Sequence, residues 1–566
     1  MSYKLQDLTK EELIDHIRHL KRQKKFGLVW ETKPEQVFEL CKTNLPVLEE
    51  VSEKSITMSS TKPVNLIIEG DNYHALSVLN YTHQGLIDAI YIDPPYNTGA
   101  KNWIYNNNYV DGNDAFRHSK WLSFMEKRLH LAKTLLKMDG VIVVTIDDYE
   151  IATLKLLMNE LFGEENHLGT VVIKSNPQGR SSVTGFQVSH EYALFYRRSQ
   201  IAKIGRLHRS EEQISRYKEL DSIGPFEWRN FRAQYSTESP KMKYPIFVKK
   251  DCSGFRLPKM KWNPNNKSYD LLEEPDDSEH ISLPIDPNGR KRTWKWSIET
   301  VESLKNTEMG VRLDKNKIPS VFYKGRMTDD LMQPYTVWDK SDYSASAMGT
   351  NLLNSLLGTK KFDYPKSIYA VMDCLRVLSS NKNAVFLDFF AGSGTTGHAV
   401  MMLNKEDGGN RKFILATNNE NSIAEEVTYP RIKNSLDYRE ELSEITGFEE
   451  NIKYFKTLLI PKSKVSDDTR ALLVSKSVDM LCIKEDSYDK LVNTTDYKII
   501  KGVDHLVGIL FNLDTIESFK KSIQEHSLPC NIYVFSLTKD TYADDFEDLG
   551  VKHNLIPITS FALNVS

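Results

Sequence analysis

The sequence lacks several features that mark other classes of protein. Its five cysteines lie far apart and form no CxxC pair, so neither a disulfide framework nor a zinc site is expected. No apolar run approaches the length that spans a membrane, and the N-terminus has no apolar signal-peptide core. No glycine-rich turn carries the lysine of a Walker A motif. We therefore expect a cytoplasmic protein that binds neither a metal ion nor a membrane.

Length and composition indicate a globular protein with more than one domain. The chain has 566 residues, of which 40% are hydrophobic and 27% charged, and this length predicts about two to four domains. The net charge of -3 hides an uneven distribution, because residues 171–330 hold 29 Lys and Arg against 21 Asp and Glu. A basic middle in an otherwise acidic chain favours contact with a polyanion, although a set of solvated faces would give the same count.

A mostly apolar run over residues 86–92 stops at Asp93, and two prolines and a tyrosine follow at once. Apolar residues bounded by turn residues are typical of a short buried strand. Pro94 and Pro95 cannot continue a sheet ladder, so the chain is expected to leave the sheet at Asp93. A carboxylate, a rigid backbone carbonyl and the aromatic face of Tyr96 then lie at a strand's carboxyl end, where open α/β sheets bind ligands.

These groups suit the chemistry of an exocyclic amine on a nucleobase. Such an amine is a poor nucleophile because its lone pair is delocalised into the ring. Two acceptors for its hydrogens, the Asp93 carboxylate and the Pro94 carbonyl, would favour a pyramidal amine and stabilise the positive charge that builds on nitrogen. Tyr96 would stack on a base swung out to reach them. The other interpretation is a plain strand exit with a buried tyrosine.

Strands and helices alternate in the first part of the chain. A strand that begins at Val64 ends in a turn with Asp71, and another ends at Ile146. The order of strands and helices predicts a mostly parallel sheet. Asp147 and Asp148 follow the second of these strands, where a helix cap is favoured over a metal site.

A glycine-rich turn opens a second α/β part. Residues 384–397 predict a strand, a tight turn and a helix, and Gly392, Gly394 and Gly397 fit the GxGxxG pattern in the strand-to-helix context that it requires. The first two of these glycines would let the backbone approach a ligand closely. Glu420 follows the next strand and is placed to hold a ribose diol. A small-residue turn that only packs a helix on a strand is the alternative.

Between these parts, from about residue 200 to 360, the alternation fades and Lys, Arg, Pro, Trp, Tyr and Asn become frequent. Cations interleaved with aromatics fit contacts to phosphates and bases. An irregular domain with scattered surface charge is the alternative. The candidate DNA-binding residues are Lys241, Lys243, Lys259, Lys261, Arg290, Arg292 and Trp294.

Two further segments flank these parts. The N-terminal one is expected to be helical and peripheral, with a basic run over residues 18–25. The C-terminal one predicts a small α/β module with strands over residues 480–483, 506–511 and 531–537 and a helix over 515–526. It shows no catalytic constellation, so assembly is its expected purpose. The expected domains are residues 1–60, 61–200, 201–360, 361–455 and 456–566.

Together the motifs resemble the β-class of amino-methylating DNA methyltransferases, in particular the modification subunits of type III restriction–modification systems. The match consists of Asp93-Pro-Pro-Tyr96 with Asn97-Thr-Gly99, followed by Phe390-Ala-Gly-Ser-Gly-Thr-Thr396. The insertion between them lies where the family places its target-recognition domain. A smaller match is Phe362-Asp-Tyr-Pro-Lys366. The resemblance covers about residues 20–440.

The resemblance implies an α/β fold, namely a doubly wound, Rossmann-like sheet with permuted motif order that binds S-adenosylmethionine across both halves of the chain. It also implies that Asp93, Pro94, Pro95 and Tyr96 hold the target amine. The implied cofactor-binding residues are Asp71 near the adenine, Asp93, Lys366 before the glycine-rich strand, Asp388, Phe390, Gly392 and Gly394 beside the methionine, and Glu420 on the ribose.

The leading hypothesis is methyl transfer to adenine N6 in double-stranded DNA, because the family's cytosine-N4 enzymes more commonly have Ser in place of Asp93. Cytosine-N4 methylation is the first alternative. The second is a non-catalytic DNA-recognition subunit that has kept a cofactor pocket, which the intact motif disfavours. Methylation of RNA or of a protein amide is weaker still. The resemblance implies a homodimer and a separate restriction subunit with helicase and nuclease activity as partners, and leaves the recognition sequence open.

Overall fold

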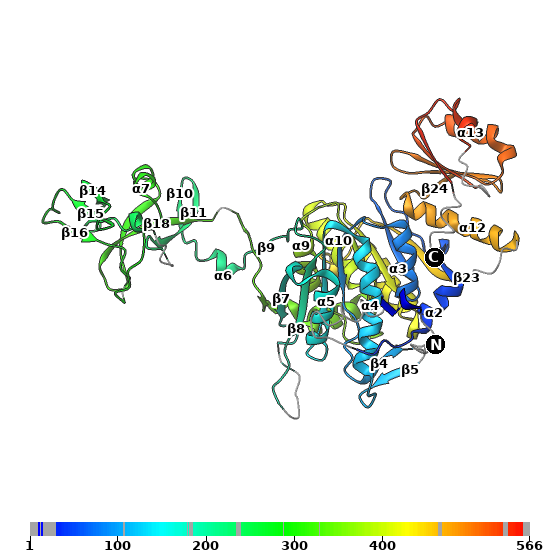
Figure 1. The fold of residues 1–566 in the computed structure, drawn as a ribbon, viewed down its shortest axis with the longest axis horizontal. Helices are drawn as coiled ribbons and strands as arrows, with labels where there is room; N and C mark the ends of the chain where they lie inside the picture. The colour runs from blue at the N-terminus through cyan, green and yellow to red at the C-terminus, as the bar shows by residue number, and fades with distance from the viewer. Residues whose placement is uncertain are drawn as a thin grey trace. The chain divides into compact units, whose positions relative to one another are not determined.

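The computed structural model describes residues 9–11, 13–14, 30–105, 108–177, 179, 185–233, 239–286, 288–327, 329–461, 467–535 and 542–557. The chain forms two compact units, of which unit 1 comprises Met1–Arg206 and Gln333–Ser566 and unit 2 comprises Leu207–Met332. Figure 1 labels several elements of each unit. The insertion expected at residues 201–360 therefore corresponds to a separate unit with narrower bounds. None of the helices in the described residues is long and apolar enough to cross a membrane.

Unit 1 is built on a ten-stranded mixed sheet. Its six consecutive strands from β23 to β6 are all parallel, which agrees with the expected α/β class. The strands in sheet order are β1 (Asn44–Glu50), β23 (Asn451–Pro461), β2 (Val64–Glu69), β22 (Lys412–Thr417), β21 (Val385–Asp388), β3 (Ile87–Ile92), β6 (Leu136–Ile146), β8 (Glu191–Arg197), β7 (His167–Ile173) and β20 (Val337–Trp338).

The sheet joins the two α/β parts at its centre. Strand β21 from the second part pairs in parallel with β3 from the first, with Phe386 opposite Ala89 and Leu387 opposite Ile90. Their carboxyl ends therefore meet at one edge, although nearly three hundred residues separate them along the chain. This is the point at which the strand order reverses, and open α/β sheets bind ligands at such points.

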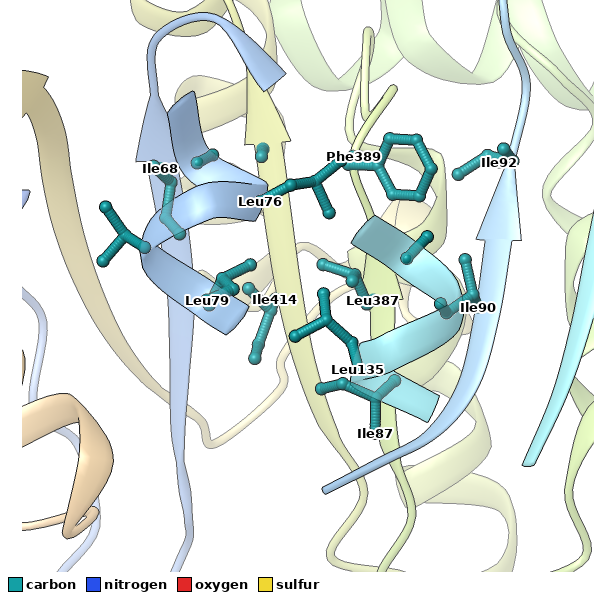
Figure 2. Packing of buried hydrophobic residues seen from close by; sticks show 14 of the residues in the cluster. Ile68, Leu76, Leu79, Ile87, Ile90, Ile92, Leu135, Leu387, Phe389 and Ile414 are labelled. Atoms are coloured by element: carbon teal, nitrogen blue, oxygen red, sulfur yellow. The ribbon is translucent and has the colours of Figure 1, made fainter. Parts of the chain in front are cut away.

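Helices cover both faces of this sheet, as the doubly wound prediction requires. Helices α3, α4 and α5 pack on one face, and Figure 2 shows Leu76 and Leu79 of α3 and Leu135 of α4 beside Ile90, Leu387 and Ile414 of the strands. On the other face Gly397 of α10 meets Leu415 of β22. The helices of unit 1 outside the C-terminal module are α2 (Gln36–Thr43), α3 (Asn72–Thr82), α4 (Arg117–Leu135), α5 (Ile151–Phe162), α8 (Leu352–Leu357), α9 (Ile368–Leu378), α10 (Thr395–Asp407) and α11 (Tyr429–Leu436).

The N-terminal segment differs from the helical segment expected over residues 1–60. Helix α2 is present, but Asn44–Glu50 forms β1, which pairs antiparallel with β23 and extends the central sheet. Leu45, Val47 and Leu48 are buried there, so the segment belongs to the core rather than the periphery. The basic run over residues 18–25 lies outside the described residues.

The described part of the C-terminal module is a five-stranded sheet that carries one helix against its face and follows a second helix in the chain. Its strands are β24 (Asp489–Asn493), β25 (Tyr497–Lys501), β26 (Leu506–Leu510), β27 (Cys530–Val534) and β28 (His553–Pro557), and α13 (Ile516–Gln524) packs through Phe519 and Ile523. The prediction of a strand over residues 480–483 is wrong, because these residues form the last turn of α12 (Asp467–Lys484). An apolar run of four residues fits a buried helix as well as a strand, and only its neighbours decide.

Unit 2 consists of short antiparallel sheets around a small core. Its described elements are β9 (Leu207–His208), α6 (Glu211–Ile214), β10 (Glu219–Asp221), β11 (Gly224–Asn230), β12 (Ile246–Lys249), β13 (Phe255–Arg256), β14 (Met260–Asn263), β15 (Ser268–Leu271), β16 (Glu279–Ser282), α7 (Ile298–Leu304), β17 (Met309–Leu313), β18 (Pro319–Arg326) and β19 (Leu331–Met332). Strand β19 pairs with β9, so the segment enters and leaves the unit at one place.

Trp294 belongs to the core of unit 2, which corrects its expected role in binding DNA. Its side chain is buried, its ring stacks on Phe231 with centroids 5.3 Å apart, and its Nε1 donates to the Tyr244 carbonyl at 2.6 Å. A ring enclosed in this way has no free face for a base. The sequence missed this because aromatics beside cations occur both in cores and on nucleic-acid surfaces.

Replacing Trp294 with Ala should destabilise unit 2 by about 3–5 kcal/mol, the usual cost of deleting a buried aromatic side chain. Trp262 is the matched control, because its ring is only half-buried on the β14–β15 hairpin. Calorimetric unfolding of the full chain measures both variants. An equal loss of stability in Trp262→Ala would contradict the core assignment.

Candidate active site

The loop after β3 is fixed by contacts from three neighbouring elements. The Thr145 hydroxyl on β6 donates to Asp93 Oδ1 at 2.7 Å, and the Trp121 indole on α4 donates to the Pro95 carbonyl at 2.7 Å. The Asn97 side chain donates to the buried Glu150 carboxylate at 2.5 Å. The Pro94 carbonyl accepts no hydrogen bond from the described part of the chain. It remains the acceptor beside Asp93 that a ligand can use.

Lys366 and Glu191 join this loop from opposite halves of unit 1. Lys366 Nζ lies 3.1 Å from Asp93 Oδ1 and 2.5 Å from Glu191 Oε2, and it also donates to the Tyr96 hydroxyl. That hydroxyl donates to Glu191 Oε2 at 2.9 Å. Lys366 was expected to bind the cofactor, and the structure places its ammonium against Asp93 and Tyr96 of the loop after β3.

Glu191 is the residue of this site that the sequence did not identify. It is the first residue of β8, and its side chain is 9% exposed. An acidic residue at the start of an apolar strand is common and does not by itself indicate a functional site. The feature that could have identified Glu191 is the position of its strand near the sheet edge that carries Asp93. The antiparallel pairing of β8 with β6 brings it there.

Burial and two charges of opposite sign set the ionisation of these groups. Burial raises the pKa of the Asp93 carboxyl, the Lys366 ammonium lowers it, and the Glu191 carboxylate raises it further. Burial alone would lower the pKa of Lys366, but the carboxylates of Asp93 and Glu191 outweigh it and hold that pKa above its ordinary value. Lys366 is therefore an ammonium.

Asp388 holds the glycine-rich turn that follows β21. Its Oδ1 accepts from the Phe390 N–H at 2.9 Å, and its Oδ2 accepts from the Thr396 hydroxyl at 2.5 Å. Burial raises the pKa of Asp388 to about 7. Both carboxylate oxygens bind the chain's own groups, so Asp388 fixes the start of α10.

The glycines of this turn are required by backbone conformation. Gly392 and Gly394 have φ of 48° and 75°, the left-handed region that other residues avoid. A methyl group at Gly392 would lie 3.4 Å from the Phe362 ring, and one at Gly394 would lie 3.3 Å from the Thr428 methyl. Both would point at protein atoms. Backbone geometry is therefore one reason for glycine at both positions, and the expected close approach to a ligand stays a prediction.

Asp71 and the residues that follow β21 lie at the same edge of the sheet, and a buried arginine links Asp71 to the Phe389 carbonyl through Asn72. Asp71 caps α3 and its Oδ1 lies 3.4 Å from the Arg128 guanidinium. Arg128 also donates to Asn72 at 2.5 Å, and Asn72 donates to the Phe389 carbonyl at 3.1 Å. No sequence pattern pointed to Arg128, which is buried on α4.

The residues at this edge fit S-adenosylmethionine. Asp71 and Glu420 follow β2 and β22, where acids suit the amine and hydroxyl groups of the adenosine. The glycine-rich turn leads into α10, whose first-turn N–H groups suit a carboxylate. Asp93 lies on the adjacent strand end. The four strand ends therefore carry donors and acceptors that suit the cofactor, with the Asp93 carboxylate beside them.

Asp147 and Asp148 show no metal-binding arrangement. Asp147 Oδ1 accepts from the Tyr149 N–H at 3.0 Å, and Asp148 Oδ1 accepts from the Tyr192 hydroxyl at 2.9 Å. Across the described residues, no group of three potential ligands gathers. The two acids hold a turn and a neighbouring strand.

The candidate DNA-binding residues of unit 2 separate into two sets. Arg292 pairs with Asp286 at 3.0 Å within its own turn, so it serves the unit's structure, as does Trp294. The Nζ of Lys241 lies 5.9 Å from the Trp262 ring. The residues of the set that remain exposed are Lys241, Lys243, Lys259, Lys261 and Arg290.

Gly394→Ala should weaken S-adenosylmethionine binding about 5- to 30-fold. The left-handed conformation costs a non-glycine residue about 1–2 kcal/mol. Without the cofactor the turn can relax to another conformation, so binding must supply this free energy. Gly408→Ala is the matched control, since Gly408 ends α10 with φ of 69° and has open space around it. Isothermal titration calorimetry measures both affinities, and equal affinities would show that the turn does not hold the cofactor.

Comparison with known proteins places the chain in a family. The model of the DNA methylase family matches residues 87–459, which include Asp93 and the glycine-rich turn. The type II methyltransferase M.KpnI of Klebsiella pneumoniae is 34% identical over 68% of this chain and 87% of its own. The type III restriction-modification enzyme EcoPI Mod subunit of Escherichia phage P1 is 28% identical over 76% of this chain and 71% of its own. Among solved structures, the PvuII DNA methyltransferase, cytosine-N4-specific, aligns with 75% of this chain and 96% of its own at a TM-score of 0.33 and 11% identity. The chain belongs to the DNA methylase family and is a DNA methyltransferase that uses S-adenosylmethionine as its methyl donor.

Proposed function

We propose that this methyltransferase modifies adenine N6 at a specific sequence in double-stranded DNA, and that Asp93, Pro94 and Tyr96 hold the target base. The observation that carries the proposal is the pair of acceptors at the β3 end, beside the glycine-rich turn after β21. They are the Asp93 carboxylate and the Pro94 carbonyl, which accepts no hydrogen bond from any described residue. Two acceptors match the two hydrogens of an exocyclic amine.

Each group contributes at a stated atom. Bound S-adenosylmethionine supplies an electrophilic methyl group on a sulfonium. Asp93 and the Pro94 carbonyl accept the two amine hydrogens, which turns the nitrogen lone pair out of conjugation with the ring. The same acceptors stabilise the positive charge on nitrogen until its proton leaves. The Tyr96 ring, whose hydroxyl is fixed by Glu191, supplies the face on which the flipped base stacks.

Cytosine-N4 methylation is the second candidate, because a cytosine amine presents the same two hydrogens. The Asp at position 93 favours adenine, since Ser is commoner there in cytosine-N4 enzymes. A non-catalytic recognition subunit is disfavoured by the intact Asp93-Pro-Pro-Tyr96 loop and by the number of contacts that fix it.

The relatives suggest partners. The Mod subunits belong by name to type III restriction-modification enzymes. We therefore infer that a separate restriction subunit accompanies this chain. Because the proposed substrate is DNA, we infer that both act in the cytoplasm. A homodimer is proposed on the same ground. The family match ends at residue 459, before α12, and we assign the module that follows to assembly.

Long-read sequencing that detects modified bases, applied to DNA from cells carrying this chain, tests the proposed reaction. N6-methyladenine at one recurring sequence is expected, and Asp93→Ala should lower methylation at least about a hundredfold, the usual cost of losing an acceptor for transition-state charge. Asp148→Ala is the matched control, because it removes a carboxylate from the adjacent strand end outside the site. N4-methylcytosine, or full activity in Asp93→Ala, would overturn the proposal.

DNA contact by unit 2 is tested by charge reversal. Lys259→Glu with Lys261→Glu should weaken DNA binding while S-adenosylmethionine affinity is kept, because lysines at phosphates act through counterion release. Each lost phosphate contact should also flatten the salt dependence of DNA affinity by about one unit of slope. Lys521→Glu, at an exposed position of the C-terminal module, is the control. An unchanged salt slope would place DNA contact elsewhere.

A further inference from the structure

Four side chains from three parts of unit 1 form one partly buried cluster at the β3 end. Asp93 and Tyr96 come from the loop after β3, Glu191 from β8, and Lys366 from the segment before α9. Lys366 contacts each of the other three, and its Nζ also lies 4.4 Å from the centre of the Tyr96 ring. Its side chain is 13% exposed. Such a set of contacts fixes the ammonium in one place.

The cluster contains two carboxylates and one cation. Without the cation, two like charges would share a poorly solvated site, and one of them would take up a proton. The cation lies between them, at hydrogen-bond distance from both Asp93 and Glu191. Thr145 supplies one further hydrogen bond to Asp93. The geometry therefore makes the charge of Asp93 depend on Lys366.

We propose that Lys366 is a positioning residue of methyl transfer, which keeps Asp93 a carboxylate, and that Glu191 holds Lys366 in place and offsets its charge. The inference rests on the proposed role of Asp93 as acceptor of the target amine. It assigns to Lys366 a role at the amine, in place of the cofactor-binding role expected from the resemblance, and it gives Glu191 a role in the reaction.

An ionised Asp93 is necessary because a protonated carboxyl would offer the amine a donor where an acceptor is needed. Burial raises the pKa of Asp93 and thereby favours the wrong form, while Lys366 acts in the opposite direction. The other titratable groups that face Asp93 are Glu191, Tyr91, Tyr96 and Asp388, none of which is a cation. Cys374 on α9 faces Glu191 and Lys366. Within the described residues, Lys366 supplies the opposing positive charge.

Glu191 offsets the positive charge of Lys366 near the reacting amine. An unpaired ammonium beside the reacting amine would repel the positive charge that builds there. With Asp93 and Glu191 ionised, the cluster carries one net negative charge, which favours that developing cation. Glu191 thus allows Lys366 to act on Asp93 without opposing the transition state.

The two positioning residues should shift the pH dependence of the reaction in opposite directions. Activity falls as pH drops through the pKa of Asp93. Lys366→Met removes the stabilising cation, so the acid limb of the pH–rate profile, where activity falls as pH drops, should move up by about one to three pH units. Lys366→Arg keeps the charge and should restore the limb toward its original position. Glu191→Gln removes a like charge from Asp93, so the limb should move down.

The measurement is the single-turnover rate of methyl transfer from pH 5.5 to 9.5 on a duplex oligonucleotide carrying the sequence identified by sequencing. S-adenosylmethionine is kept saturating, and its affinity is measured at each pH by calorimetry, because Asp388 has a pKa of about 7 and titrates in the same range. Lys366→Met should keep its S-adenosylmethionine affinity. The double variant Lys366→Met/Glu191→Gln keeps the net charge of the cluster and replaces the single variant if that variant does not fold. Its acid limb should lie at a higher pH than that of Glu191→Gln alone.

A uniformly lower rate with unmoved acid limbs would show that Lys366 and Glu191 are merely structural, and would overturn the inference. Loss of S-adenosylmethionine affinity in Lys366→Met would return Lys366 to the cofactor. Full activity in Asp93→Ala would refute the site assignment itself. An inactive Asp93→Ala together with unmoved limbs in the other variants would refute this inference alone.

Discussion

The parallel pairing of β21 with β3 is the contact on which the rest of the site depends. It joins strands from distant parts of the chain through Phe386, Leu387, Ala89 and Ile90, and these residues are buried on both faces of the sheet. Parallel strands place their carboxyl ends at one edge, so this pairing alone sets the glycine-rich turn after β21 beside Asp93 and Pro94. Any shift in its register would move Asp388 relative to Asp93.

Two kinds of constraint fix the groups at that edge. On the cofactor side the backbone is constrained, through left-handed glycines and the hydrogen bonds of Asp388 to the turn. Around Asp93, charge is constrained, through an ammonium shared by two carboxylates. The division follows the chemistry of the proposed reaction, in which the methyl donor is held in a fixed orientation and the amine meets ionised acceptors.

The sequence was sufficient to predict those parts of the fold and site for which one local stretch of residues carries the information. The turn after β3 follows from the prolines at 94 and 95, and the doubly wound sheet follows from strand–helix alternation, as the structure bears out. Glu191 and Arg128 could not be found, because their roles arise from partners far away in sequence, Lys366 in one case and Asp71 in the other. Trp294 was misassigned because burial, which decides between a core ring and a stacking ring, is a property of the folded unit.

The charge count of the basic middle overstates what is available to DNA, because unit 2 uses much of its arginine internally. Arg256 pairs with Glu273 and Glu279, and Arg326 pairs with Asp221 and Glu308. A guanidinium held on two carboxylates has its fork of donors occupied, and the fork is what reads a guanine edge. The exposed members of the candidate set are lysines except for Arg290, and a lysine acts at a phosphate as a point charge. If unit 2 binds DNA as proposed, affinity through phosphates is spread over several lysines, and within this set of exposed residues only Arg290 carries a fork of donors for a base edge.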